Sequence, residues 1–124
     1  MKSNTPVSEQ ANAKTSDELF EMANLYPRTT GLPMTVWVGP RGNARHDVRI
    51  KVNMSHGNQM NVDNTAVVGV RPAPHLIAGR LSSQDQHLVF EWVGLNAAAI
   101  FAYWDGDIDT AELIQALKRL PPTP

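Results

Sequence analysis

The sequence contains no cysteine among its 124 residues. Disulfide bonds and thiolate metal ligands are therefore excluded, although a small extracellular domain of this size would often rely on disulfides. The absence of cysteine favours a reducing, cytoplasmic location. The net charge of −1 gives no overall electrostatic preference for an anionic partner.

Long apolar runs are also missing. The first 14 residues lack the apolar segment of a secretory signal. The most apolar helical stretch, residues 95–104, is well short of the roughly 18 residues that a membrane span needs. We expect no membrane contact. We also expect residues 1–14 to form a disordered tail and residues 15–120 to form a single α+β domain.

Recognised catalytic motifs are absent as well. There is no Gly-x-Ser-x-Gly elbow, no phosphate-binding loop and no pair of histidines at a common metal-site spacing. His46 is followed by Asp47, but neighbouring residues of a strand point to opposite faces, so the two cannot pair directly. We expect no enzymatic activity, cofactor or metal. A concave pocket around His46 with a nearby carboxylate would instead favour an enzyme.

One acidic run, from Asp105 to Asp109, resembles the start of a calcium-binding loop. Such a loop needs glycine at its sixth position and glutamate at its twelfth, where this chain has Thr110 and Ala116. We therefore interpret the run as a turn between two helices, with Asp109 as the N-cap of the second helix.

Between residues 34 and 70, even-numbered positions hold almost all apolar side chains. They are Met34, Val36, Val38, Val48, Ile50, Val52, Met54, Met60, Val62, Ala66, Val68 and Val70. Because neighbouring side chains of a strand point to opposite faces, this pattern predicts several strands that share one apolar face. The odd-numbered positions then form a polar face that is net basic.

The strands are predicted over residues 34–38, 47–54 and 59–71, the last one broken near residues 63–64. The shared parity allows Val38 to oppose Val48 across the first hairpin. It also favours a three-residue second turn over residues 56–58, with Met54 opposite Met60. Residues 75–78 fit a short edge strand and a packed connector equally well.

Three helices are predicted around these strands. Thr15 and Glu18 fit a capping box for a short first helix, which we expect Pro27 to end. A second helix is predicted from Ser83, capped with Gln86, to about residue 104. A third helix follows Asp109, and we expect residues 92 and 104, both tryptophan, to be the largest core contributors.

The predicted architecture is therefore α+β. A three- to four-stranded antiparallel meander is covered on one face by a C-terminal helical hairpin, and a short N-terminal helix is added to it. The predicted sheet region, residues 28–80, has seven basic and two acidic side chains, whereas residues 81–124 have two basic and six acidic ones. This distribution fits attraction between the two layers, and it also fits a bipolar surface that meets an anionic partner.

The outer sheet face is the candidate binding surface. Tryptophan and arginine are enriched at the energetic centres of protein interfaces, which favours a protein-interaction or self-association module. Basic groups around an aromatic ring also fit single-stranded nucleic acid, which is the alternative. Trp37 could instead pair with an arginine across the sheet, or be covered by the N-terminal helix or another subunit. The candidate residues are Trp37, Arg41, Arg45, Arg49, Lys51 and Arg71.

Overall fold

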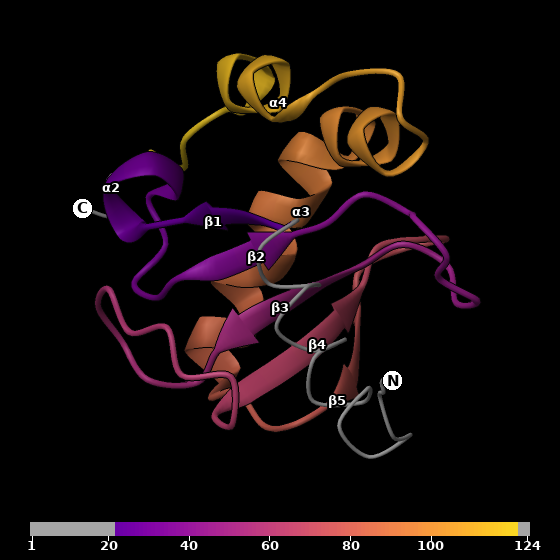
Figure 1. The fold of residues 1–124 in the computed structure, drawn as a ribbon. Helices are drawn as coiled ribbons and strands as arrows, with labels where there is room; N and C mark the ends of the chain where they lie inside the picture. The colour runs from indigo at the N-terminus through magenta and orange to yellow at the C-terminus, as the bar shows by residue number, and fades with distance from the viewer. Residues whose placement is uncertain (1–21, 122–124) are drawn as a thin grey trace, which may run out of the picture.

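The computed structural model describes residues 22–121. Its elements are β1 (Ala23–Leu25), α2 (Pro27–Thr30), β2 (Val36–Val38), β3 (Arg49–Asn53), β4 (Thr65–Gly69), β5 (His75–Ala78), α3 (Ser83–Trp104) and α4 (Thr110–Ala116). The five strands form one antiparallel sheet in chain order (Figure 1). This confirms the α+β class, but the predicted three to four strands are wrong, because residues 23–25 form β1 and residues 75–78 form β5 at the edges of the sheet.

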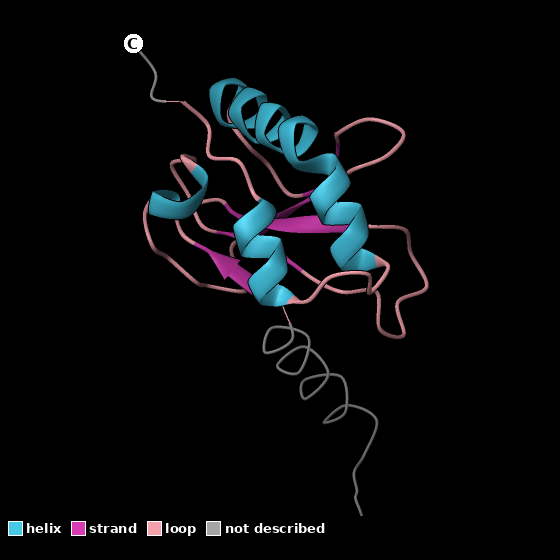
Figure 2. Ribbon diagram, turned by 90° about the horizontal axis from the view of Figure 1, so that it is seen from above, coloured by secondary structure: helices cyan, strands magenta, loops and turns pink. Residues whose placement is uncertain are grey.

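The apolar face of the sheet packs against α3, as the even-numbered pattern predicts. Val36, Ile50 and Val68 are fully buried in a core that continues into α3. Both predicted large core residues, Trp92 and Trp104, are buried there. Since α3 crosses behind the sheet while α4 lies beyond the β1 edge, one helix rather than a hairpin covers this face (Figures 1 and 2).

The predicted register of the first hairpin is wrong by two residues. Val38 pairs with Ile50 rather than Val48, so Trp37 lies opposite Lys51 rather than Arg49. A shift of two residues keeps every side chain on the same face, and the apolar pattern therefore cannot distinguish the two registers.

The predicted three-residue second turn is also wrong. Val52 pairs with Ala66, so a long connection over residues 54–64 joins β3 to β4. Gly57 has a positive φ of 91°, but its N–H donates to the Pro33 carbonyl at 2.8 Å and its carbonyl accepts from Thr35 Oγ1 at 3.0 Å. The connection is thus attached to the segment before β2 instead of closing a tight hairpin.

The predicted first helix is wrong over its last residues. Ala23 and Leu25 are buried in β1, which pairs with β2, because their alternation also fits an edge strand that completes the sheet. Pro27 does not end a helix but stands at the first position of α2, where its missing N–H is no loss. The predicted tail over residues 1–14 and the start of the predicted helix lie outside the described residues.

The caps of the C-terminal helices follow the sequence closely. Ser82, one residue earlier than predicted, caps α3 by accepting the Asp85 N–H on its side chain. Asp109 and Glu112 form the predicted capping box at the start of α4. The acidic run before Asp109 is the turn between the two helices, as interpreted. Over residues 22–121, no helix has the length and apolar character needed to cross a membrane.

Candidate functional site

Trp37, the predicted aromatic anchor, is buried. Its side chain is 1% exposed, and its neighbours across the sheet are Asn24 and Lys51. The indole ring is therefore not presented to a partner in this structure. Its role in partner binding stays a prediction that would require the ring to be uncovered.

The basic candidates other than Arg71 divide into two groups. Arg41 and Arg45 are exposed on the connection between β2 and β3, whereas Arg49 and Lys51 are half-buried on β3. The Arg41 N–H donates to the Trp104 carbonyl at 3.0 Å, which attaches this connection to the end of α3. Neither Arg41 nor Arg45 makes an ion pair with a residue of the described part of the chain.

Arg71 is held in an ion pair. Its Nη2 donates to Asp47 Oδ1 at 2.7 Å, its Nε donates to Oδ2 at 2.9 Å, and its guanidinium lies 4.7 Å from the Phe101 ring centroid. This hydrogen bonding, with a smaller contribution from the Val48 backbone, lowers the pKa of Asp47 from 3.8 to about 2. The charge of Arg71 is thus already balanced within the chain.

His46 forms no hydrogen bond or ion pair with a carboxylate of residues 22–121. Its Nδ1 lies 2.7 Å from the backbone carbonyl of Asp47, and its ring centroid is 5.7 Å from that of Trp104. These contacts pack the β2–β3 connection against the end of α3. The histidine with a carboxylate partner is His56 instead.

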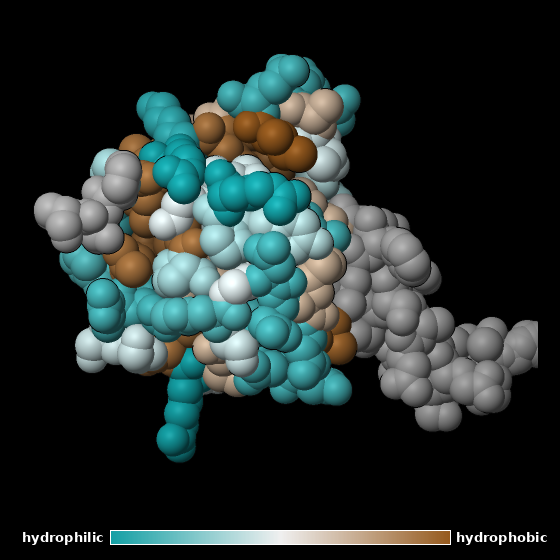
Figure 3. Space-filling model, turned by 90° about the vertical axis from the view of Figure 1, so that its left-hand side faces the viewer, coloured by the Kyte–Doolittle hydropathy of each residue, from teal (hydrophilic) through white to brown (hydrophobic). Residues whose placement is uncertain are grey.

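A groove of about 400 Å³ lies where four segments meet. Residues 31–33, His56, the first turns of α3 and residues 119–121 line it, and we call it the α2–α3 groove. Figure 3 views the side of the molecule that carries α2 and shows apolar surface between polar residues. The volume is within the range of small-molecule sites, about 300–1,000 Å³.

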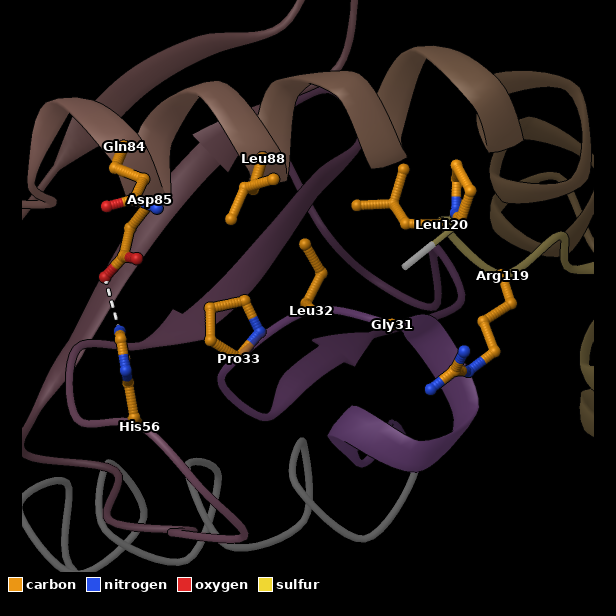
Figure 4. Close-up of a pocket in the computed structure, with 10 residues that line it drawn as sticks. Gly31, Leu32, Pro33, His56, Gln84, Asp85, Leu88, Arg119 and Leu120 are labelled. Atoms are coloured by element: carbon orange, nitrogen blue, oxygen red, sulfur yellow. Dashed lines mark hydrogen bonds and ion pairs between the residues drawn. The ribbon is translucent and has the colours of Figure 1, made fainter. Parts of the chain in front are cut away.

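One end of the α2–α3 groove is acidic. Asp85 Oδ2 lies 2.8 Å from His56 Nε2, and the side chains are 12% and 60% exposed respectively (Figure 4). The first turn of α3 positions Asp85, since its N–H is bound by Ser82 and the helix dipole favours a carboxylate there. The second oxygen, Oδ1, accepts no hydrogen bond from the described residues.

The other end of the groove is basic. Arg119 Nε donates to the Arg28 carbonyl at 3.2 Å, and Figure 4 shows its guanidinium across the groove from the His56–Asp85 pair. The Leu120 N–H donates to the Thr30 carbonyl at 2.8 Å, which fixes the segment that carries Arg119. Gly31 permits this approach, since a Cβ there would lie 2.7 Å from the Leu120 carbonyl oxygen.

Apolar side chains lie between the two ends. Leu32, Pro33, Leu88 and Leu120 project between the His56–Asp85 pair and Arg119 in Figure 4. None of the described residues that line the groove is serine, threonine or cysteine, so this lining offers no hydroxyl or thiol nucleophile. Over residues 22–121, no three histidine, aspartate or glutamate side chains gather as metal ligands. The groove thus presents charged groups at its two ends and apolar side chains between them.

Sequence reasoning missed this groove. His56 and Asp85 are 29 positions apart, and they meet because the long connection before β4 folds onto the start of α3. The only local signal was the capped first turn that contains Asp85. No pattern in the sequence indicates that Arg119 lies in the same groove as His56 and Asp85.

No protein-family model matches the chain, and no curated protein or solved structure shows significant similarity to it.

Proposed function

We propose that this protein is a cytoplasmic, non-enzymatic protein-interaction module that self-associates through β5, the strand at one edge of the sheet. One observation carries the proposal. The four residues of β5 are all exposed at the edge of the sheet, and Leu76 and Ile77 are 37% and 46% exposed. The proposal keeps the predicted class of function and moves the contact from the Trp37 face to this edge, because Trp37 is buried.

The backbone of β5 supports this assignment. Its only strand partner is β4, and beyond that ladder no backbone hydrogen bond joins residues 75–78 to the described residues. An unpaired strand edge is a template for a further strand, and natural proteins commonly protect such edges with charged side chains. The sequence His75–Ala78 contains no lysine, arginine or carboxylate.

The geometry of a sheet restricts how two copies can pair. A two-fold axis perpendicular to the sheet keeps each side chain on its own face, so opposed positions must differ by an even number. Ile77 would then lie opposite its symmetry copy, or Leu76 opposite its copy. A four-residue strand gives few ladder hydrogen bonds, so we expect weak association with a dissociation constant between about 1 μM and 1 mM.

Sedimentation velocity over a range of protein concentrations tests the proposal. We expect the wild-type chain to shift toward a dimer as concentration rises, and Ile77→Lys to stay monomeric because a lysine ammonium would be buried at the strand pairing. Ile114→Lys is the matched control, since Ile114 is 47% exposed on α4. A wild-type chain that stays monomeric up to about 1 mM would contradict the proposal, as would equal effects of the two variants.

Single-stranded nucleic acid remains the second candidate. It is favoured by the exposed guanidinium groups of Arg41 and Arg45 on one connection, neither of which forms an ion pair within residues 22–121. Such binding must weaken steeply as salt rises, because cations that contact phosphates release counterions. Fluorescence anisotropy with labelled oligothymidylate should show binding that the double Arg41→Gln, Arg45→Gln variant loses and the exposed control Arg80→Gln keeps. Absence of binding at low salt would eliminate this candidate.

A further inference from the structure

The α2–α3 groove combines three features that self-association does not use. A carboxylate lies at one end, a guanidinium lies at the other, and leucine and proline side chains lie between them. None of the groove residues belongs to β5, so the groove and the proposed dimer edge do not overlap.

We propose that this groove binds a small amphipathic zwitterion of the ω-amino carboxylic acid class. The carboxylate of the ligand pairs with Arg119, and its ammonium group pairs with Asp85. The alkyl body covers Leu88 and Leu120. Each part of the ligand thus meets a protein group of complementary charge or polarity.

The basic end selects a carboxylate. A guanidinium presents its N–H groups in a planar fork that matches the two oxygens of a carboxylate. Arg119 uses its Nε for the Arg28 carbonyl, which holds the side chain in place while its two terminal nitrogens make no hydrogen bond to a described residue. Those nitrogens are the donors that we assign to the ligand.

The acidic end selects a cation or an N–H donor. Asp85 is mostly buried, its Oδ2 is bound to His56, and its Oδ1 accepts no hydrogen bond from the described residues. A second carboxylate at this end would be repelled by Asp85, which disfavours dicarboxylic acids. The groove therefore distinguishes a zwitterion from a simple anion.

Both ends are ordered before a ligand arrives. Ser82 and His56 hold Asp85, while Arg28 and Thr30 hold the segment that carries Arg119. A ligand then does not have to order these side chains on binding, which removes part of the entropic cost of association. We expect measurable affinity even though the groove is open to solvent on one side.

Titration of the labelled full chain by NMR tests the proposal with three probes of similar length. 6-Aminohexanoate carries both charged ends, hexanoate lacks the ammonium group and hexylamine lacks the carboxylate. We expect saturable shifts at the amides of Gly31, Gln84, Leu88 and Arg119, with at least about tenfold tighter binding of 6-aminohexanoate than of either other probe. Lack of saturation below about 10 mM would overturn the proposal.

Variants separate the two ends of the groove. Arg119→Gln should reduce 6-aminohexanoate binding about tenfold, whereas Arg80→Gln, an exposed arginine outside the groove, should leave it unchanged. Asp85→Asn should make hexanoate bind as well as 6-aminohexanoate. If Asp85→Asn unfolds the chain, the Arg119→Gln result and the comparison of probes still decide. Equal effects of Arg119→Gln and Arg80→Gln would show that binding is non-specific and would overturn the proposal.

Discussion

Replacing Asn96 with leucine should substantially destabilise the protein. Asn96 is 3% exposed on α3, and its amide forms a pair of hydrogen bonds with the backbone of Lys118, beyond the end of α4. Its Oδ1 accepts the Lys118 N–H at 2.7 Å, and its Nδ2 donates to the Lys118 carbonyl at 3.0 Å. The Asn96 amide thus satisfies both the N–H and the carbonyl of Lys118, as the backbone of a neighbouring antiparallel strand would.

The magnitude follows from those two hydrogen bonds. Leucine has the same number and branching of side-chain heavy atoms as asparagine and is bulkier, so the substitution leaves no cavity. The loss therefore comes from the Lys118 N–H and carbonyl, each left without its partner at a cost of about 1–3 kcal/mol when buried. Because Lys118 lies near the surface, water can satisfy part of this demand, and we expect a loss of about 2–4 kcal/mol. Nδ2 also donates to the Trp92 carbonyl, which should add little.

Urea denaturation followed by circular dichroism measures this change, with Gln115→Leu as an exposed control on α4. Hydrogen exchange gives a second readout, because the Lys118 amide should lose its protection in Asn96→Leu. Unchanged stability together with a protected Lys118 amide would refute the reasoning. Since Lys118 precedes Arg119, the same variant should also weaken binding in the α2–α3 groove.

Two further changes test other parts of the structure. Because the folded-state pKa of Asp47 is about 2 and its ordinary value is 3.8, the pair with Arg71 stabilises the folded state above about pH 3.8, and this contribution is lost as the pH falls through about 2. An NMR titration of the Asp47 carboxyl should give a midpoint near 2, and Arg71→Gln should raise it toward 3.8; an unchanged midpoint would contradict the assigned cause. Gly79→Ala should cost at least about 2 kcal/mol in thermal or chemical unfolding, because Gly79 has a φ of +82° and a Cβ would lie 2.6 Å from the Ala66 Cα. A stability equal to that of the wild type would show that β5 can shift away from β4 to accept the methyl group.

The sequence predicts which face of a strand each side chain lies on better than it predicts which residue lies opposite it across the sheet. The even-numbered positions correctly indicate which side chains of β2, β3 and β4 enter the core, because the period of a strand is a local property. Registers separated by two residues satisfy the same pattern, and the choice between them depends on the connections. Gly57 illustrates this, since the structure uses it to contact Pro33 instead of closing a hairpin.

The segment around residues 23–26 shows a different limit of sequence-based prediction. The spacing of Leu19, Met22, Ala23 and Tyr26 fits a helix, while the burial of Ala23 and Leu25 fits a strand. Short segments of this kind are decided by what they pack against. Here β2 offers a free edge, and pairing with it places Ala23 and Leu25 beside the core.

The predicted site depended on the exposure of one ring, which no local pattern determines. Trp37 is at the predicted position on the outer face, yet it is buried. Arg71 already forms an ion pair with Asp47. The β5 edge lies in a segment that fits a strand and a connector equally well from sequence, and the groove forms where connections around residues 31–33 and His56 meet the start of a predicted helix.

The proposals for β5 and for the α2–α3 groove can be separated by experiment. Ile77→Lys changes only the strand edge, and Arg119→Gln changes only one end of the groove. If each variant weakens its own binding event and leaves the other intact, the chain is a small scaffold with two independent surfaces. If Ile77→Lys also abolishes binding of 6-aminohexanoate, the groove requires the assembled dimer. The zwitterion would then stabilise the dimer by the same factor, since coupling between two binding equilibria is reciprocal.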